Sequence, residues 1–187
     1  MKAQFKLIHN VKYQLRDKDG KLLPIFQENW FFTWLMKKGF VSPHFFKIPF
    51  LLGNWKLEKN VSNLITNAGR GLISGLINGS GSPAAATYIA VGTGSTAANV
   101  TDTTLQTESS TAGLSRAAAT VSLVTGSVTN DTAQMLKAFS VTGSVAVTES
   151  GVLNAASTGT LLCRQVFAAV NVVNGDTFTV TWQIKNA

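Results

Sequence analysis

The chain has 187 residues, which is enough to bury a hydrophobic core without disulfides, and its one cysteine, Cys163, has no partner for an internal bridge. We therefore expect Cys163 to be a small buried residue rather than a reactive thiol. The first twenty residues alternate polar and apolar side chains and carry basic residues throughout, which argues against a secretory signal peptide.

The net charge and the aromatic residues are distributed unevenly. Residues 1–60 hold eleven Lys and Arg against four acids, whereas residues 61–187 hold five against five, so the whole net charge of +7 lies in the first part. Eight of the eleven Phe and three of the four Trp precede residue 56. We therefore predict two parts: a strand pair with a basic, aromatic docking arm over residues 1–60, and a β-sandwich domain over residues 61–187.

The N-terminal residues predict a pair of strands. The stretch KAQFKLIHNVKYQLRD alternates polar and apolar residues, and DKDG at residues 17–20 is a turn signal. The returning stretch KLLPIFQEN contains Pro24, which lacks an N–H and therefore favours the edge of a sheet.

The stretch WFFTWLMKKGFVSPHFFKIPF, residues 30–50, concentrates aromatic side chains and lysines. Residues 30–38 have a helical pattern, and Pro43 and Pro49 prevent a continuous helix after it. Aromatic side chains that follow one another with few polar residues between them favour burial, and a small arm has too little volume to enclose all of them. We therefore predict that part of this stretch is buried against another protein subunit. The predicted docking residues are Trp30, Phe31, Phe32, Trp34, Lys37, Lys38, Phe45, Phe46, Lys47 and Phe50.

Three other interpretations of the aromatic stretch stay open. It could form the core of the arm itself, or an interfacial membrane anchor, because Trp, Phe and Lys settle at the headgroup boundary. It could also bind nucleic acid, because lysines neutralise phosphates and aromatic rings stack on bases. We expect no specific nucleic acid, because the rings are clustered rather than spaced between basic residues, and no membrane span, because lysines, His44 and prolines interrupt the apolar run.

The stretch NLITNAGRGLISGLING predicts a helix over about residues 66–78, with Thr66 or Asn67 as the cap and Gly79 at its end. The apolar residues that share one face of this helix are Ala68, Leu72, Ile73, Leu76 and Ile77. Two glycines weaken the isolated helix and are expected to allow another backbone to approach closely, namely Gly71 and Gly75.

From Thr87 onward the pattern changes to strands. Short runs of β-branched and small residues are separated by turn clusters of Gly, Ser, Asn and Asp, at intervals of about 8 to 12 residues. The last run, DTFTVTWQIKN, places one apolar set on a single face, namely Phe178, Val180, Trp182 and Ile184. We therefore predict a mainly β fold, an antiparallel β-sandwich or jelly roll with one short helix packed at one end.

The chain offers few groups for catalysis or metal binding. His9 and His44 show no metal-ligand spacing, and we expect the acids after residue 60 in turns or at strand starts, accepting backbone N–H groups. These acids are Asp102, Glu108, Asp131, Glu149 and Asp176. The stretch GTGSTA, residues 92–97, matches a loose dinucleotide fingerprint, but no helix is predicted after it, so we interpret it as a turn. We predict no enzymatic activity, no cofactor and no metal site.

The segments NLITNAGRGLISGLING, TYIAVGTGSTAANVTDTTLQTE, TESGVLNAASTGTLLCRQVF and GDTFTVTWQIKN, together with Arg116, form an ordered set of motifs over about residues 60–187. In this order they resemble a broad set of virion structural proteins of tailed bacteriophages, which includes tail-fibre-like, collar-like and decoration proteins. The resemblance implies a non-enzymatic, β-rich virion component that is usually a homo-oligomer. The insertion from Gln27 to Trp55 departs from the family pattern, so the docking residues there are predicted from composition alone.

The combined prediction is a non-enzymatic virion structural protein that docks on other virion subunits, as a capsid decoration or cement protein or as a tail, collar or fibre component. One alternative is a host-receptor or glycan-binding fibre module, with exposed aromatic residues and polar loops at the tips of the sandwich. A second alternative is contact with a membrane or with nucleic acid through the arm.

Overall fold

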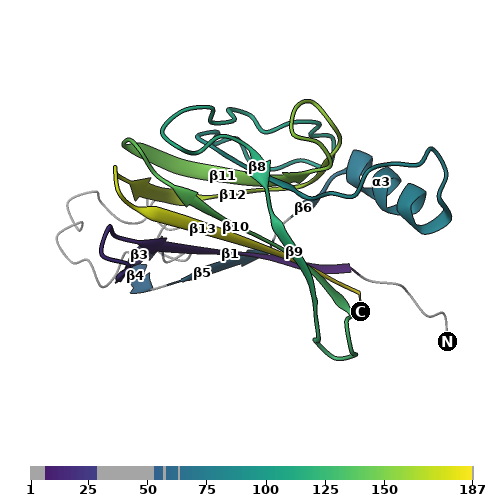
Figure 1. Cartoon of the computed structure of the whole chain (residues 1–187), viewed down its shortest axis with the longest axis horizontal. Coiled ribbons are helices and arrows are strands. Elements are labelled where there is room, and N and C mark those ends of the chain that lie inside the picture. Colours follow the sequence, from purple (N-terminus) through teal and green to yellow (C-terminus); the bar gives the residue numbers. More distant parts are fainter. Residues whose placement is uncertain (1–6, 29–52, 57, 63, 187) are drawn as a thin grey trace, which may run out of the picture.

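The computed structural model describes residues 7–28, 53–56, 58–62 and 64–186. In these ranges the chain forms two antiparallel sheets that pack face to face, one short helix and a separate two-stranded ribbon (Figure 1). The predicted mainly β fold with one short helix is confirmed. The helical pattern at residues 30–38 lies outside the described residues.

The first sheet has the strand order β2-β1-β13-β10-β9, and β5 also pairs with β1. Its strands are β1 Leu7–Arg16, β2 Leu22–Leu23, β5 Lys59–Ser62, β9 Thr120–Val124, β10 Thr132–Ser140 and β13 Thr177–Asn186. β1 pairs with β13 along its whole length, from Leu7 opposite Asn186 to Arg16 opposite Thr177. Residues on both sides of position 60 therefore build this sheet.

The second sheet has the strand order β6-β12-β11-β7-β8. Its strands are β6 Leu64–Ile65, β7 Tyr88–Gly92, β8 Ala117–Ala118, β11 Val145–Leu153 and β12 Leu161–Val172. β8 pairs with β7 in this sheet, and β9, which follows almost directly in the chain, pairs with β10 in the other sheet. The segment 117–124 therefore joins the two layers along one side of the sandwich.

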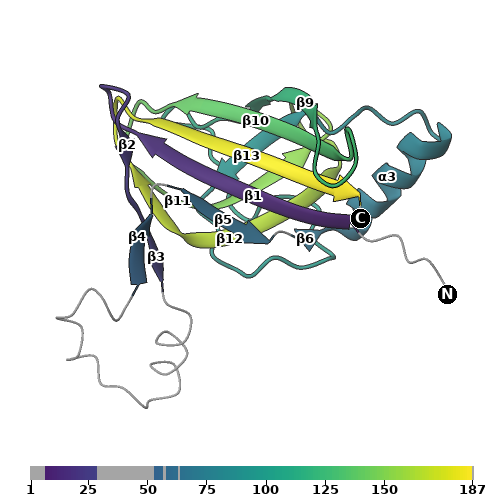
Figure 2. The same ribbon diagram turned by 90° about the horizontal axis from the view of Figure 1, so that it is seen from below.

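A tight turn and a proline divide the N-terminal region as the sequence predicts. Oδ1 of Asp17 accepts hydrogen bonds from the backbone N–H groups of Asp19 and Lys21 at 3.0 and 2.9 Å, and Gly20 has a φ of 79°. β2 lies at the edge of the first sheet and ends before Pro24. The chain continues into a separate ribbon of two strands, β3 Ile25–Glu28 and β4 Gly53–Lys56, which projects from the sandwich (Figure 2).

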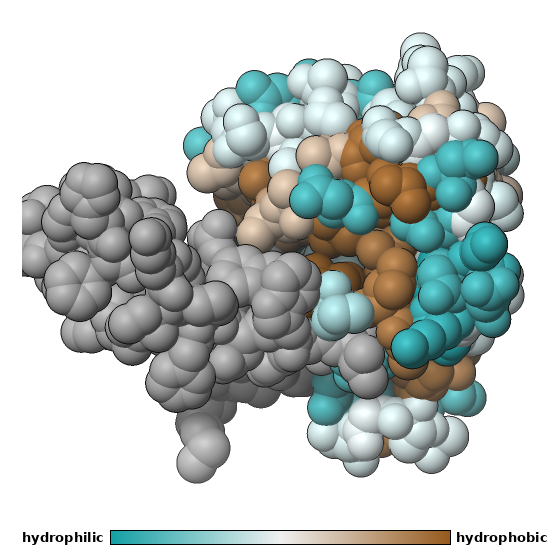
Figure 3. Space-filling view, turned by 90° about the vertical axis from the view of Figure 1, so that its left-hand side faces the viewer, coloured by the Kyte–Doolittle hydropathy of each residue, from teal (hydrophilic) through white to brown (hydrophobic). Residues whose placement is uncertain are grey.

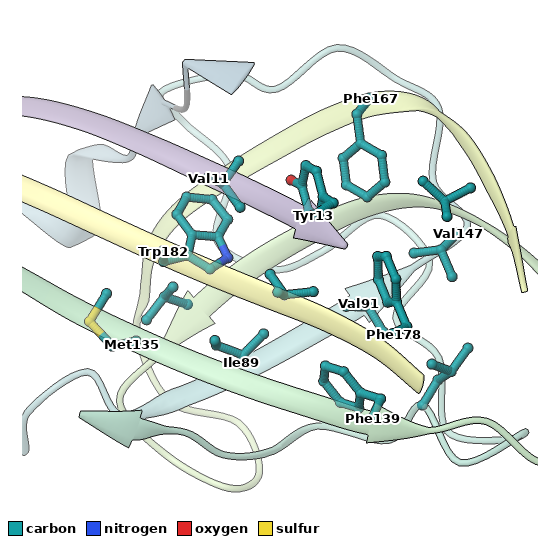
Figure 4. Close-up of a cluster of buried hydrophobic side chains, with 14 of the residues drawn as sticks. Val11, Tyr13, Ile89, Val91, Met135, Phe139, Val147, Phe167, Phe178 and Trp182 are labelled. Carbon is teal, nitrogen blue, oxygen red and sulfur yellow. The ribbon is translucent and has the colours of Figure 1, made fainter. Parts of the chain in front are cut away.

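The core lies between the two sheets and follows the predicted alternation in β13. Phe178, Val180 and Trp182 are fully buried, and the hydroxyl and amide residues between them face away from the core. The ring of Tyr13 packs against the rings of Phe167 and Phe178, and its centroid lies 4.0 and 6.1 Å from theirs (Figure 4). The indole Nε1 of Trp182 donates a hydrogen bond to Oγ of Ser150 at 3.1 Å, so a polar contact also joins the layers.

The helix α3, Asn67–Asn78, has the predicted ends. Oγ1 of Thr66 accepts a hydrogen bond from the backbone N–H of Gly69 at 2.9 Å and donates one to the carbonyl of Leu161 at 2.6 Å. Gly79 ends the helix with a φ of 72°, in the left-handed region. The cap thus fixes the start of α3 on β12.

The prediction for Gly71 is wrong, because a Cβ built there would meet nothing within 4 Å. The close approach occurs at Gly69 instead, where a Cβ would lie 2.0 Å from the carbonyl oxygen of Leu162 on β12. Gly75 does lie close to another backbone segment, since its Cβ would be 3.0 Å from the carbonyl oxygen of Ser80. The helix therefore faces β12 with its first turn.

Candidate functional site

Strands β11 and β12 place a buried acid beside a buried arginine. Glu149 is 0% exposed and Arg164 is 2% exposed. The Nε of Arg164 donates to Oε2 of Glu149 at 2.8 Å, and its Nη1 donates to Oδ2 of Asp102 at 2.7 Å. Its Nη2 donates to the carbonyl of Thr96 at 3.1 Å. All three nitrogens of the guanidinium are therefore occupied.

The carboxylate of Glu149 is occupied in the same way. Its Oε1 accepts hydrogen bonds from the backbone N–H groups of Gly94 and Thr107 at 3.1 and 2.7 Å. Its Oε2 accepts from the N–H of Gln106 at 3.0 Å in addition to Arg164. The side chain thus holds the long connection between β7 and β8 against the second sheet. The sequence prediction of a turn or strand start is wrong for Glu149, because it lies inside β11.

Arg164 stays charged in this setting. Burial lowers its pKa, but hydrogen bonds to Asp102 and Glu149 outweigh this effect and hold the pKa above its usual value. Oδ2 of Asp102 also accepts a hydrogen bond from the backbone N–H of Asn99 at 2.9 Å. The three charged groups are therefore used to fix the loop, and neither Glu149 nor Arg164 is placed to act as a free general acid or base.

A polar depression of about 310 Å³ lies beside these charges. It is lined by Thr96, Thr101, Asp102, Thr103, Thr104, Gln106 and Arg164. Hydroxyl and amide groups dominate this lining, so the surface is suited to hydrogen bonding.

A second ion pair joins two other loops. The Nε and Nη2 of Arg116 donate to the two carboxylate oxygens of Glu108 at 2.9 and 2.6 Å. This is the bidentate geometry typical of arginine–carboxylate pairs. The Nη1 of Arg116 donates to the carbonyls of Ala155 and Thr158 at 3.2 and 2.7 Å. Arg116 therefore connects the loop before β8 to the loop between β11 and β12.

The two remaining acids after residue 60 lie in turns, as predicted. Asp131 accepts hydrogen bonds from the backbone N–H groups of Gly126, Ser127 and Val128, and Asp176 accepts one from Val173 at 2.9 Å. The bonds to Asp131, the one from Val128 foremost, hold the pKa of its carboxyl well below the usual value. These carboxylates fix turns in the sandwich.

Within residues 7–28, 53–56, 58–62 and 64–186, no group of three or more His, Cys, Asp and Glu residues is arranged to hold a metal ion. Cys163 is fully buried, as predicted, and burial raises the pKa of its thiol, so the thiol stays protonated. None of the described helices is long and apolar enough to cross a membrane.

A large apolar groove lies between α3 and the β9–β10 side of the first sheet, with a volume of about 540 Å³. We define the apolar groove by its lining residues, which are Ile73, Leu76, Ala85, Ala86, Thr87, Val121, Ser122, Leu123, Ala133, Gln134, Met135, Leu162 and Ile184. None of them is charged. Val121 and Leu123 are 55% and 62% exposed, which is unusual for large apolar residues that face a core.

The register explains why these two residues face the groove. Val121 lies opposite Met135 and Leu123 lies opposite Ala133, so both side chains point to the core side of the first sheet. Their exposure means that the second sheet does not cover this corner. The sequence shows the alternation within β9, but it does not show that the opposing layer ends short of it.

The other end of the sandwich, from which the β3–β4 ribbon leaves, also has apolar surface between the two layers (Figure 3). Val173, in the turn between β12 and β13 at this end, is 52% exposed. Because β3 ends at Glu28 and β4 begins at Gly53, residues 29–52 connect the two strands of the ribbon. All ten predicted docking residues belong to this connection and lie outside the described residues.

Comparisons with protein-family models, with curated proteins and with solved structures found no match to this chain. The geometry of the chain and the pattern of its residues must therefore carry any argument about function. They offer two charged networks that fix loops, an apolar groove, and a projecting ribbon that carries the aromatic insertion.

Proposed function

We propose that the chain is a non-enzymatic structural protein of a tailed-bacteriophage virion, which docks on other virion subunits through its aromatic insertion. It would act as a capsid decoration or cement protein, or as a tail, collar or fibre component. One observation carries the proposal: the insertion is joined to the sandwich by the β3–β4 ribbon, which points away from both sheets (Figure 2). A projecting ribbon is well suited to present a docking segment to a neighbouring subunit.

The charged residues of the sandwich support a structural role. Each acid after residue 60 accepts hydrogen bonds within the fold, and the two most buried charges, Glu149 and Arg164, have each other as partners. A sandwich with its loops fixed in this way is a stiff spacer. The ordered motifs that resemble virion proteins lie in this same sandwich.

Burial of the docking residues against a partner would supply the binding energy for attachment. Burying one Phe or Trp side chain contributes about 2 to 3 kcal/mol. Trp30, Phe31 and Trp34 would act as the apolar anchors, and Lys37, Lys38 and Lys47 would face an acidic surface on the partner. Several copies on one particle strengthen attachment further, because each bound copy raises the effective concentration of linked neighbours.

The test is incorporation of a variant into particles made from a phage genome that carries this gene. We expect the triple variant W30S/F31S/W34S to fold, because residues of the described strands form a core cluster between the two sheets, and to be missing from purified particles. The matched control is Val128→Ser, which changes an apolar residue that is 68% exposed in the β9–β10 turn and should be incorporated normally. Normal amounts of the triple variant in particles would refute the docking role.

The polar depression supports one alternative, a glycan-binding or host-receptor module. Threonine hydroxyls, the Gln106 amide and the Asp102 carboxylate are groups that hydrogen-bond to sugars. A glycan array probed with the intact chain and with T103V/T104V separates the two proposals. Binding that the double variant loses would favour the alternative, and no binding by either protein would leave the docking role as the better explanation.

A further inference from the structure

The strand β9 forms an open edge of the first sheet. It pairs with β10, from Thr120 opposite Leu136 to Val124 opposite Thr132, and no other described strand lies on its second side. The backbone N–H and C=O groups on such an edge pair readily with another strand. Natural proteins usually block an edge with a charged residue or a proline, but β9 reads TVSLV and has neither.

The side chains of β9 add an apolar surface to this edge. Val121 and Leu123 lie on the core side of the sheet and form one wall of the apolar groove. Helix α3 forms the facing wall with Ile73 and Leu76, and Leu76 is 45% exposed. An added strand would therefore gain both backbone hydrogen bonds and apolar contacts.

We propose that β9 is a homodimer interface, at which β9 of a second copy adds in the antiparallel direction and extends the first sheet across a two-fold axis. With the axis at Ser122, Val121 of each copy lies opposite Leu123 of the other. Thr120 then lies opposite Val124 on the outer face. The axis stands perpendicular to the sheet, so the core sides of both copies face the same way and their apolar grooves join.

The pattern of β9 favours a second copy over a different protein. Its sequence is self-complementary in this register on the core side, because Val121 meets Leu123 there, and Ser122 meets Ser122 on the outer face. Residues 61–187 carry no net charge and the apolar groove has no charged lining residue, so two copies do not repel each other there. The apolar groove has no charged lining residue that would select an oppositely charged partner.

This interface goes beyond the proposed function, because it uses none of the predicted docking residues. The two ideas can therefore fail separately. The triple variant W30S/F31S/W34S should remain dimeric in solution. A variant of β9 leaves the residues of the aromatic insertion unchanged.

Sedimentation equilibrium of the full chain tests the dimer. We expect twice the mass of one chain for the natural sequence and for Val128→Lys, and the mass of a single chain for V121K/L123K. Circular dichroism and thermal unfolding of V121K/L123K check its fold, and the milder V121T/L123T should weaken the dimer if the lysine variant does not fold. A natural sequence that stays monomeric at high micromolar concentration overturns the proposal.

Cross-linking identifies the edge that is used. Cys163 is fully buried, so a cysteine introduced on the surface is the accessible thiol. A short bis-maleimide is expected to join two copies of Ser122→Cys, and not two copies of Thr104→Cys, which lies in an exposed loop. Equal cross-linking of both variants, or none for Ser122→Cys, would mean that β9 is not the interface.

Discussion

Nε of Arg164 donates a hydrogen bond to Oε2 of Glu149 at 2.8 Å, and both side chains are almost completely buried on adjacent strands. The other polar atoms of these two side chains also have hydrogen-bond partners, which stabilises the buried pair. Three of these partners are backbone N–H groups of the connection between β7 and β8, and they donate to Glu149. Burying charges is costly unless they are paired and hydrogen-bonded. The pair therefore anchors a long loop that has little secondary structure of its own.

Removing one charge of this pair should destabilise the sandwich strongly. We expect Glu149→Gln to lower the free energy of unfolding by about 3 kcal/mol, because Arg164 loses its fully buried counter-ion and keeps only the partly exposed Asp102. The control is Glu108→Gln, whose carboxylate pairs with Arg116 but is 28% exposed and should cost less. Urea denaturation measures both, and equal stability of the two variants would contradict the role of the buried pair.

The contact between α3 and β12 predicts opposite effects at two glycines of the same helix. Gly69→Ala should destabilise the protein or displace the helix, because the new Cβ would lie 2.0 Å from the carbonyl oxygen of Leu162. Gly71→Ala should stabilise it by about 0.5 to 1 kcal/mol, because alanine favours the helix and nothing lies within 4 Å. Thermal unfolding compares them directly. If Gly69→Ala is tolerated as well as Gly71→Ala, the first turn of α3 does not pack closely against Leu162 of β12.

Asp131 should make stability depend on pH. Its backbone hydrogen bonds lower the pKa of the carboxyl in the folded state, whereas the unfolded chain has a pKa of about 3.9. The stabilisation is thus fully present above about pH 4 and is lost as the pH falls toward the lowered value. Asp131→Asn is expected to be less stable than the natural sequence at pH 7, and the difference should shrink at acid pH. A difference that is constant between pH 7 and pH 2.5 would argue against this assignment.

The hydrogen bond between Trp182 and Ser150 should contribute to stability from inside the core. Ser150→Ala leaves the indole N–H of Trp182 buried without an acceptor, which costs about 1 to 3 kcal/mol. In a Trp182→Phe background the same serine change should cost less, because no donor remains. A double-mutant cycle measures this coupling, and strictly additive effects would show that the bond contributes nothing.

The sequence could predict those features that depend on neighbours along the chain. The alternation in β13, the turn at Asp17–Gly20 and both ends of α3 follow from local patterns, and the structure confirms them. The partnership of Glu149 and Arg164 could not be predicted, because it depends on the register between β11 and β12. The same is true of Gly69, since the pattern of a helix does not tell which of its glycines meets another strand.

The apolar groove could not be predicted from the sequence either. Val121 and Leu123 have the alternation of an ordinary half-buried strand, and only the extent of the opposing sheet leaves them exposed. The docking role of Trp30, Phe31 and Trp34 is a different case. It stays a prediction, because these residues lie outside the described part of the chain.

Zero-length carbodiimide cross-linking of purified particles, read out by mass spectrometry, tests the docking proposal most directly. This reagent joins lysines to carboxylates that are in contact. The proposal predicts links from Lys37, Lys38 or Lys47 to Asp or Glu of a different virion protein. Particles that lack the chain, or links from these lysines only to acids of their own chain, would contradict it.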